Sequence, residues 1–169
     1  MSEYLLRFPD ERDRLTNLLA AIAAGWSLAS RRESRGHVTC GSLLVDAGGR
    51  TLHVRHKTLG RWLLPGGHLE DRDSSLLHAA LRELREETAI GPEQIEPIQD
   101  GPIDIDVHAI PANAAKGEPE HWHADFVYAF RATTADVVLD LSEVTDFAWL
   151  ERPAVGNLAS KLEPILGGR

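Results

Sequence analysis

The stretch from Gly66 to Thr88 constrains the fold more than any other part of the chain. It begins with a Gly-Gly pair and continues into a segment whose glutamates, Glu83, Glu86 and Glu87, are spaced i, i+3 and i+4. In a helix each residue advances about 100°, so the three carboxylates share an arc roughly 100° wide. Like charges this close repel one another, and Mg²⁺ or Mn²⁺, which prefer carboxylate oxygens, would compensate. The pattern therefore predicts a helix with a metal-binding face.

A solvated acidic helix face is the alternative interpretation, with the glutamates paired to Arg82 and Arg85. Two features argue against it. An apolar stripe runs beside the glutamates, which places the acids at the edge of a buried face; it comprises Leu77, Ala80, Leu81, Leu84 and Thr88. The Gly-Gly pair also precedes the helix, where bare backbone can approach a ligand closely. Both features favour the metal site.

The same residues resemble the Nudix box, whose pattern is G-x5-E-x7-R-E-U-x-E-E-x-G-U with U aliphatic. The matching positions are Gly67, Arg82, Glu83, Leu84, Glu86, Glu87 and Ile90. The preceding segment, Trp62 to Gly66, resembles the strand that usually leads into the box. The resemblance implies an α/β fold, an α/β/α sandwich around a mixed sheet. It also implies Mg²⁺- or Mn²⁺-dependent hydrolysis of a diphosphate linked to another moiety.

Two positions depart from the family pattern. Asp73 stands at the first box glutamate, and eight residues rather than seven separate it from Arg82. We expect Asp73 or Ser74 to cap the helix N-terminus. Ala89 replaces the late box glycine, and alanine resists the left-handed conformation that closes a helix, so Gly91 is expected to close it instead. Neither departure removes a carboxylate from the R-E-U-x-E-E core.

The resemblance assigns roles to individual residues of the box. The three glutamates are the expected metal ligands, and one of them could instead act as general base. Gly67 or Gly66 would offer a backbone carbonyl to the metal. Arg82 would orient a glutamate through a charge-assisted hydrogen bond. Glu70 could contact metal or water, with an exposed turn residue as the alternative.

A second unusual segment is His121-Trp122-His123-Ala124-Asp125. Alternate side chains of a strand share a face, so His121, His123 and Asp125 would point the same way. Two imidazoles and a carboxylate could bind Zn²⁺, although same-face residues about 6.5–7 Å apart are widely spaced for one ion. We favour a role in lining the substrate pocket over a zinc site, because a histidine there would contact phosphate or act as base. Ordinary strand packing is the third alternative.

The loop before this segment, residues 111–120, adds further candidates. Lys116 could pair with a phosphate, and Glu118 or Glu120 could complete the metal shell, as loops outside the box often do in this family. A solvated loop is the alternative for each of these residues. Trp62 and Trp122 could stack on a base, with burial in the core as the alternative.

Length and charge bound the remaining possibilities. The 169 residues fit one domain, with an N-terminal helix and charged linker in 1–36 and the core in 37–169. The formal charge is −8, and residues 91–169 carry 14 acidic but only 5 basic side chains. This argues against a nucleic-acid polymer as partner. One cysteine, no signal peptide and no long apolar segment predict a cytoplasmic protein without membrane contact.

Periodicity and turn residues predict the order of the elements. Residues 10–29 have the pattern of an amphipathic helix ending near Gly25. Residues 74–88 and 153–166 are the other predicted helices. The predicted strands are 38–46, 51–56, 61–64, 95–98, 103–110, 121–131 and 144–150.

We expect a hydrolase that directs water at a phosphorus of a nucleoside diphosphate derivative or nucleoside triphosphate. Its partner would be this small molecule, and a homodimer is a further possibility because many family members dimerise. A sensor that binds such a ligand without turnover is the alternative from another class. An isomerase of isopentenyl diphosphate would need a reactive cysteine, and Cys40 is the one candidate.

Overall fold

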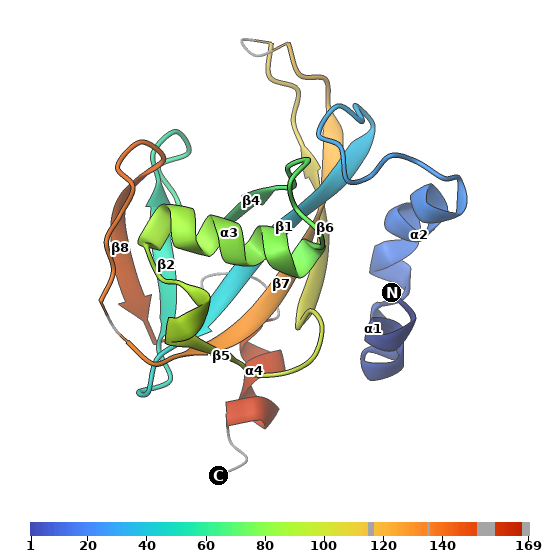
Figure 1. The fold of residues 1–169 in the computed structure, drawn as a ribbon. Helices are drawn as coiled ribbons and strands as arrows, with labels where there is room; N and C mark the ends of the chain where they lie inside the picture. Colours follow the sequence, from blue (N-terminus) through green and yellow to red (C-terminus); the bar gives the residue numbers. More distant parts are fainter. Residues whose placement is uncertain (115–116, 135, 152–157, 167–169) are drawn as a thin grey trace.

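The computed structural model describes residues 1–114, 117–134, 136–151 and 158–166 (Figure 1). Its helices are α1 (Ser2–Arg7), α2 (Thr16–Ala23), α3 (Leu76–Thr88) and α4 (Leu158–Leu166). Its strands are β1 (Gly36–Val45), β2 (Thr51–His56), β3 (Trp62–Leu63), β4 (Gly66–His68), β5 (Ile95–Pro97), β6 (Asp104–Ile110), β7 (His121–Ala132) and β8 (Val144–Leu150). Each predicted strand is present, and no described helix is long and apolar enough to cross a membrane.

The strands form one mixed sheet built around β1. The hydrogen-bonded order is β3-β2-β1-β7-β5, with β4 pairing with β1, β6 with β7 and β8 with β2. β1 and β7 are parallel over ten residue pairs, from Gly36 opposite Trp122 to Val45 opposite Arg131. All ten residues of β1 are buried, as expected for a central strand with both faces covered.

Helices cover the two faces of this sheet, which confirms the predicted sandwich. Alternate residues of β1 point to opposite faces. Leu44 packs with Leu84 of α3, whereas Leu43 and Val45 pack with Leu158 of α4. Figure 1 shows α3 lying across the sheet and α4 behind it. Residues 153–157 of the predicted last helix lie outside the described residues.

The N-terminal segment differs from the single helix predicted over 10–29. Two 3₁₀ turns, Pro9–Glu11 and Asp13–Leu15, precede α2, which ends at Ala23 next to a left-handed Gly25. The tighter 3₁₀ spiral places residues three apart on one side. Glu11 and Arg14 therefore face inward together and form an ion pair of 2.7 Å. Burial of this polar pair replaces the continuous apolar face that periodicity suggested.

A buried polar network attaches this segment to the core. Asp104 at the start of β6 lies 2.5 Å from both Arg14 and Lys161 of α4. The Tyr4 hydroxyl contacts Glu11 and Asp104 and accepts a hydrogen bond from the backbone N–H of Ile105. The predicted charged linker thus follows a segment that is fixed to the sheet and to α4.

Candidate active site

The start of α3 corrects the predicted cap. Ser75, not Asp73 or Ser74, is the N-cap residue, and its hydroxyl accepts a hydrogen bond from the backbone N–H of His78. The residue inserted before Arg82 moves the cap one position along the chain. Asp73 is thereby free to turn inward, where its carboxylate accepts from the Glu70 backbone N–H at 2.8 Å.

The end of α3 corrects a second prediction. Ala89 itself takes the left-handed conformation, with φ of 58°, and its backbone N–H bonds to the carbonyl of Arg85. Gly91 instead begins the next 3₁₀ turn, with φ of −96°. Ile90 is fully buried at once after the helix, and this anchoring compensates for the strain at Ala89.

Arg82 is the centre of the charge network on α3. Its guanidinium donates to the His68 carbonyl at 2.8 Å and to Asp73 at 3.0 Å. It also lies 3.0 Å from Glu83 and 2.8 Å from Glu86. Arg82 thus joins the turn after β4 to two of the candidate metal ligands.

Glu83 and Glu87 are buried on the side of α3 that faces β4. The Gly66 backbone N–H donates to Glu87 at 3.1 Å. A Cβ on Gly67 would lie only 2.4 Å from Glu83, so a side chain at Gly67 would displace this carboxylate. Burial raises the pKa of Glu83, and it raises the pKa of Glu87 to about 8. A cation bound beside these two buried carboxylates would stabilise their ionised form.

Glu86 lies at the edge of this pair and is more exposed. Its two oxygens contact Arg72 at 2.7 Å and Arg82 at 2.8 Å. Glu70 also pairs with Arg72, at 2.7 Å, as an exposed residue of the turn. Both interpretations of the glutamate cluster are therefore visible: a buried pair beside bare backbone, and an arginine-paired third member.

Glu143, immediately before β8, is a site residue that the sequence did not reveal. Its negative charge lies close enough to Glu83 and Glu87 to contribute to the raised pKa of each. The sequence pointed to Glu118 and Glu120 for an acid from outside the box. Glu118 instead lines a separate cavity, where its carboxylate lies 3.9 Å from the guanidinium of Arg31.

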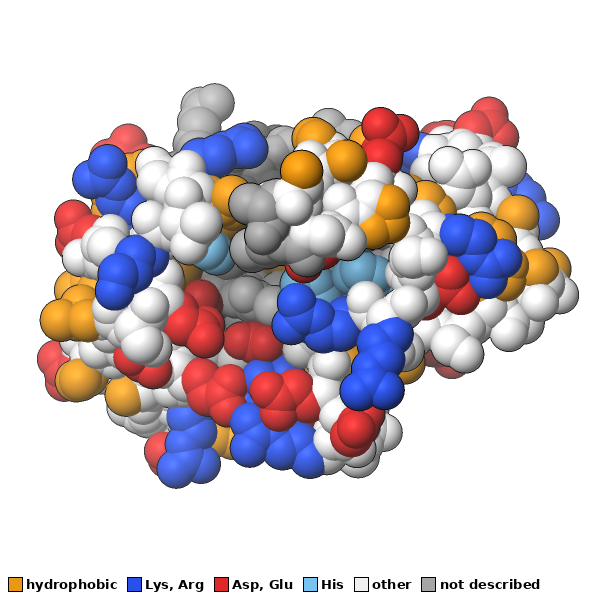
Figure 2. Space-filling view, turned by 90° about the horizontal axis from the view of Figure 1, so that it is seen from above, with side chains coloured by type: hydrophobic (Ala, Val, Ile, Leu, Met, Phe, Trp, Pro, Cys, Tyr) orange, Lys and Arg blue, Asp and Glu red, His pale blue; other side chains and the backbone are white. Residues whose placement is uncertain are grey.

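That cavity has a volume of about 410 Å³ and contains a cluster of histidines. Five histidines line it, together with Arg31 and Arg32: His37, His56, His68, His121 and His123. Figure 2 shows histidines at the bottom of a hollow, with basic side chains at its edge and acidic ones gathered alongside. Burial lowers the pKa of His68 to about 4 and of His123 to about 3, so both rings are neutral.

The remaining predicted substrate residues lie elsewhere. Asp125 lies 3.9 Å from His108, which also pairs with Asp106 at 3.0 Å. Trp62 is half-buried on β3, opposite Arg55 of β2, and does not line the described cavities. Trp122 stacks on Trp26 with ring centroids 6.4 Å apart. Lys116 lies outside the described residues.

Cys40 has the environment of a core residue. It is 2% exposed and packs with Ala79 and Ala80 of α3. Burial raises the pKa of its thiol to about 12, so the thiolate needed for reaction is disfavoured. The isomerase alternative therefore loses its candidate residue.

Comparison with known proteins identifies the family. A model of the NUDIX domain matches residues 35–166, most of the chain. The protein therefore belongs to the Nudix family, which confirms the resemblance carried by the segment from Gly67 to Ile90.

Curated relatives match parts of the chain. The probable DHNTP pyrophosphohydrolase of Lactococcus lactis subsp. cremoris is 31% identical over 105 residues, covering 59% of this chain and 60% of the relative. An uncharacterized Nudix hydrolase, NudL of Escherichia fergusonii, is 47% identical over 49 residues, covering 29% of this chain and 25% of that protein. The chain thus spans less than two thirds of the length of either relative.

Solved structures show the same fold. The Ap4A hydrolase of C. elegans, in a binary complex, has a TM-score of 0.57 at 19% identity, covering 78% of this chain and 98% of that chain. The dihydroneopterin triphosphate pyrophosphohydrolase of E. coli has a TM-score of 0.54 at 16% identity, covering 78% and 96%. At such identities the likeness is one of fold alone.

Proposed function

We propose that this protein is a divalent-metal-dependent hydrolase that cleaves the diphosphate linkage of a nucleoside diphosphate derivative or a nucleoside triphosphate. The observation that supports it is the burial of Glu83 and Glu87 beside the bare backbone of Gly66 and Gly67. Arg82 pairs with Glu83, but Glu87 has no ion pair among the described residues. Burying these two carboxylates costs free energy, which a hard cation would offset.

The donor set fits Mg²⁺ or Mn²⁺. Glu83, Glu86 and Glu87, with the carbonyl of Gly67, would hold the metal, because hard divalent ions take oxygen ligands. Bound metal would neutralise charge on the diphosphate and its leaving group. Glu86 would have to exchange its contacts with Arg72 and Arg82 to take part.

The protein's own residues orient the site and move the proton. Arg82, fixed by the buried Asp73, holds Glu83 and the His68 carbonyl in place. Glu143 comes from outside the box and is exposed, so it is free to take a proton from the attacking water. Most of the rate enhancement would then come from holding the water and the phosphorus in the geometry needed for attack.

The substrate is assigned to the histidine-lined cavity beside the box. Arg31 and Arg32 line this cavity and a second hollow next to it, as suits an anionic ligand. His121 and His123 also line it, and Lys116 stays a predicted phosphate partner. Asp125 and Trp62 are weaker candidates because neither lines it. A triphosphate substrate is consistent with the Lactococcus relative, which is named a probable DHNTP pyrophosphohydrolase, and a nucleotide stays a prediction. A cytoplasmic location and a homodimer stay predictions.

The test is hydrolysis of a substrate panel with chromatography of the products. The panel contains nucleoside di- and triphosphates, nucleotide sugars, ADP-ribose, dinucleoside polyphosphates and dihydroneopterin triphosphate, each with Mg²⁺ or Mn²⁺ and with a chelator. We expect metal-dependent cleavage of one class, lost in Glu83→Gln and Glu87→Gln. Tight binding without cleavage of any member would support the sensor alternative.

A further inference from the structure

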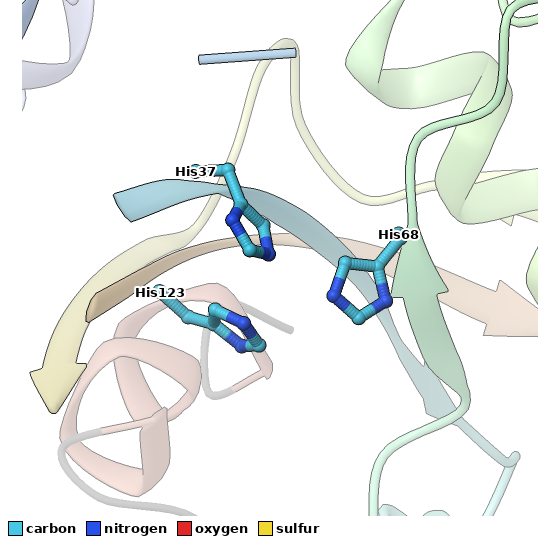
Figure 3. A group of neighbouring side chains, drawn as sticks. All are labelled: His37, His68 and His123. Atoms are coloured by element: carbon cyan, nitrogen blue, oxygen red, sulfur yellow. The ribbon is translucent and has the colours of Figure 1, made fainter. Parts of the chain in front are cut away.

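Three histidines from three different strands converge beside the glutamate site. His37 lies on β1, His68 on β4 and His123 on β7, and Figure 3 shows their rings pointing toward one another. The strand register causes the convergence, because His37 pairs with His123 and the nearby Thr39 pairs with His68. One nitrogen from each ring lies within 4.8 Å of the others.

His37 has a free lone pair that faces the group. Its Nδ1 lies 3.2 Å from the Glu33 carbonyl, which can only accept, so Nδ1 carries the proton. The other nitrogen, Nε2, is then an acceptor, yet it is buried and has no hydrogen-bond partner among the described residues. The residue as a whole is 4% exposed. Carbonyl-anchored imidazoles of this kind are the usual form of metal-binding histidines.

The neighbouring His121 determines which nitrogen of His123 carries the proton. Its Nδ1 lies 2.8 Å from the Pro119 carbonyl, so its Nε2 also carries a lone pair, and this atom is 3.2 Å from Nε2 of His123. Nε2 of His123 therefore donates to this acceptor, which leaves Nδ1 of His123 as its free lone pair.

We propose that His37, His68 and His123 bind one divalent transition-metal ion, of which Zn²⁺ is the type, at a site separate from the glutamates of α3. Imidazole nitrogens suit Zn²⁺ and its neighbours, whereas Mg²⁺ and Mn²⁺ prefer the carboxylates. Nitrogens on one tetrahedral ion stand about 3.3 Å apart for bonds of roughly 2.0–2.1 Å. The 4.8 Å limit in the structure therefore requires a modest inward turn of the half-buried His68 and His123.

Three protein ligands leave a position on the ion that faces the cavity. Two arginines and two glutamates line the cavity, Arg31, Arg32, Glu33 and Glu118, and Arg31 lies 3.9 Å from Glu118. Their charges offset one another, so the cavity keeps room for an anionic ligand atom on the ion. Three protein ligands with one open position is the arrangement of zinc sites that bind substrate or water.

The test uses Co²⁺ as a visible substitute for Zn²⁺, in a Glu83→Gln/Glu87→Gln background that weakens the carboxylate site. Chelator-treated protein is titrated with Co²⁺ and its visible absorption is recorded, because tetrahedral nitrogen ligation absorbs far more strongly than octahedral oxygen ligation. We expect the protein to bind one equivalent of Co²⁺ with an intense absorption band. The band should disappear when Zn²⁺ displaces the Co²⁺. His37→Gln, His68→Gln and His123→Gln should each weaken binding at least tenfold.

His56→Gln is the matched control, because His56 lines the same cavity but is not one of the three ligands. It should bind Co²⁺ like the background protein. If His37→Gln does not fold, as judged by near-UV circular dichroism, the half-buried His68 and His123 decide the question. No intense band in the background protein, or a band that survives the three ligand variants, would overturn the proposal. Hydrolysis with Mg²⁺ alone is measured separately, so failure of either proposal leaves the other standing.

Discussion

Asp73 and Arg82 form a buried ion pair, with Asp73 Oδ2 3.0 Å from Arg82 Nη2, across the one-residue insertion in the Nudix box. The Asp73 side chain is fully buried and that of Arg82 is 9% exposed. Burial alone would raise the pKa of Asp73, but hydrogen bonds from Arg82 and the Glu70 backbone hold it below its usual value. The shorter side chain and the extra residue thus compensate for each other.

Breaking this pair should cost both stability and activity. We expect Asp73→Asn to lower the free energy of unfolding by about 3 kcal/mol, because Arg82 keeps its charge and loses a buried partner. We also expect kcat/KM to fall roughly tenfold or more, because Arg82 holds Glu83 and the His68 carbonyl. Urea denaturation and hydrolysis assays measure the two effects. Asp71→Asn, at an exposed neighbour, is the control, and equal behaviour of both variants would contradict the assigned role.

The buried glutamates should separate activity from stability. We expect Glu87→Gln to lose most turnover without losing stability, because the amide oxygen can still accept from Gly66 and no charge is buried. Glu83→Gln should also lose turnover. Glu86→Gln gives up two ion pairs at an exposed position, so its stability should change by less than about 1 kcal/mol. Thermal melts in chelator provide the measurement, with Glu96→Gln, at an exposed position of β5, as control. Near-normal turnover by Glu87→Gln would remove it from the metal site.

The network around Tyr4 predicts a specific acid sensitivity. Burial would raise the pKa of Glu11, but hydrogen bonds from Lys161, Tyr4 and Arg14 lower it below its usual value. A lowered pKa contributes stability that is present above the unfolded value and is lost as pH falls through the folded value.

The wild type should therefore lose more stability than Glu11→Gln between about pH 5 and about pH 3. Urea midpoints at several pH values measure this, and Glu3→Gln, at an exposed residue of α1, is the matched control. Parallel pH profiles for the wild type and Glu11→Gln would show that the Glu11 contacts contribute little in solution.

The spacing of apolar and polar residues predicted most of the fold, because strands and helices each require their own period of buried side chains. The strands and α3 follow from alternation and from the apolar stripe beside the glutamates. The predicted helix over 10–29 is present only over Thr16–Ala23, because periodicity cannot reveal that Arg14 turns inward to Asp104, some ninety residues away. The N-cap at Ser75 was not predicted, because the spacing of the box does not reveal where the chain accommodates the inserted residue.

The site could be predicted only where it lies on one element. Glu83, Glu86 and Glu87 share a helix, so their spacing revealed them. His37, His68 and His123 come together through the parallel pairing of β1 with β7, and strand register over such a separation leaves no local signal. Glu143 approaches the glutamates by a similar long-range path.

The two glycines of β4 should respond differently to the same substitution. A Cβ on Gly66 would lie 2.3 Å from the Cys40 carbonyl and 2.8 Å from the Gly41 Cα, and this backbone of the central strand cannot yield. A Cβ on Gly67 would meet Glu83 at 2.4 Å, and a side-chain end can move aside.

We expect Gly66→Ala to lose about 1–3 kcal/mol of stability or more, by overpacking. Gly67→Ala should stay near the wild type in urea denaturation and lose activity, because the displaced carboxylate is a proposed metal ligand. Unfolding curves and hydrolysis assays on both variants test the contrast. If Gly67→Ala were the less stable of the two, or kept full turnover, the placement of Glu83 against β4 would have to be revised.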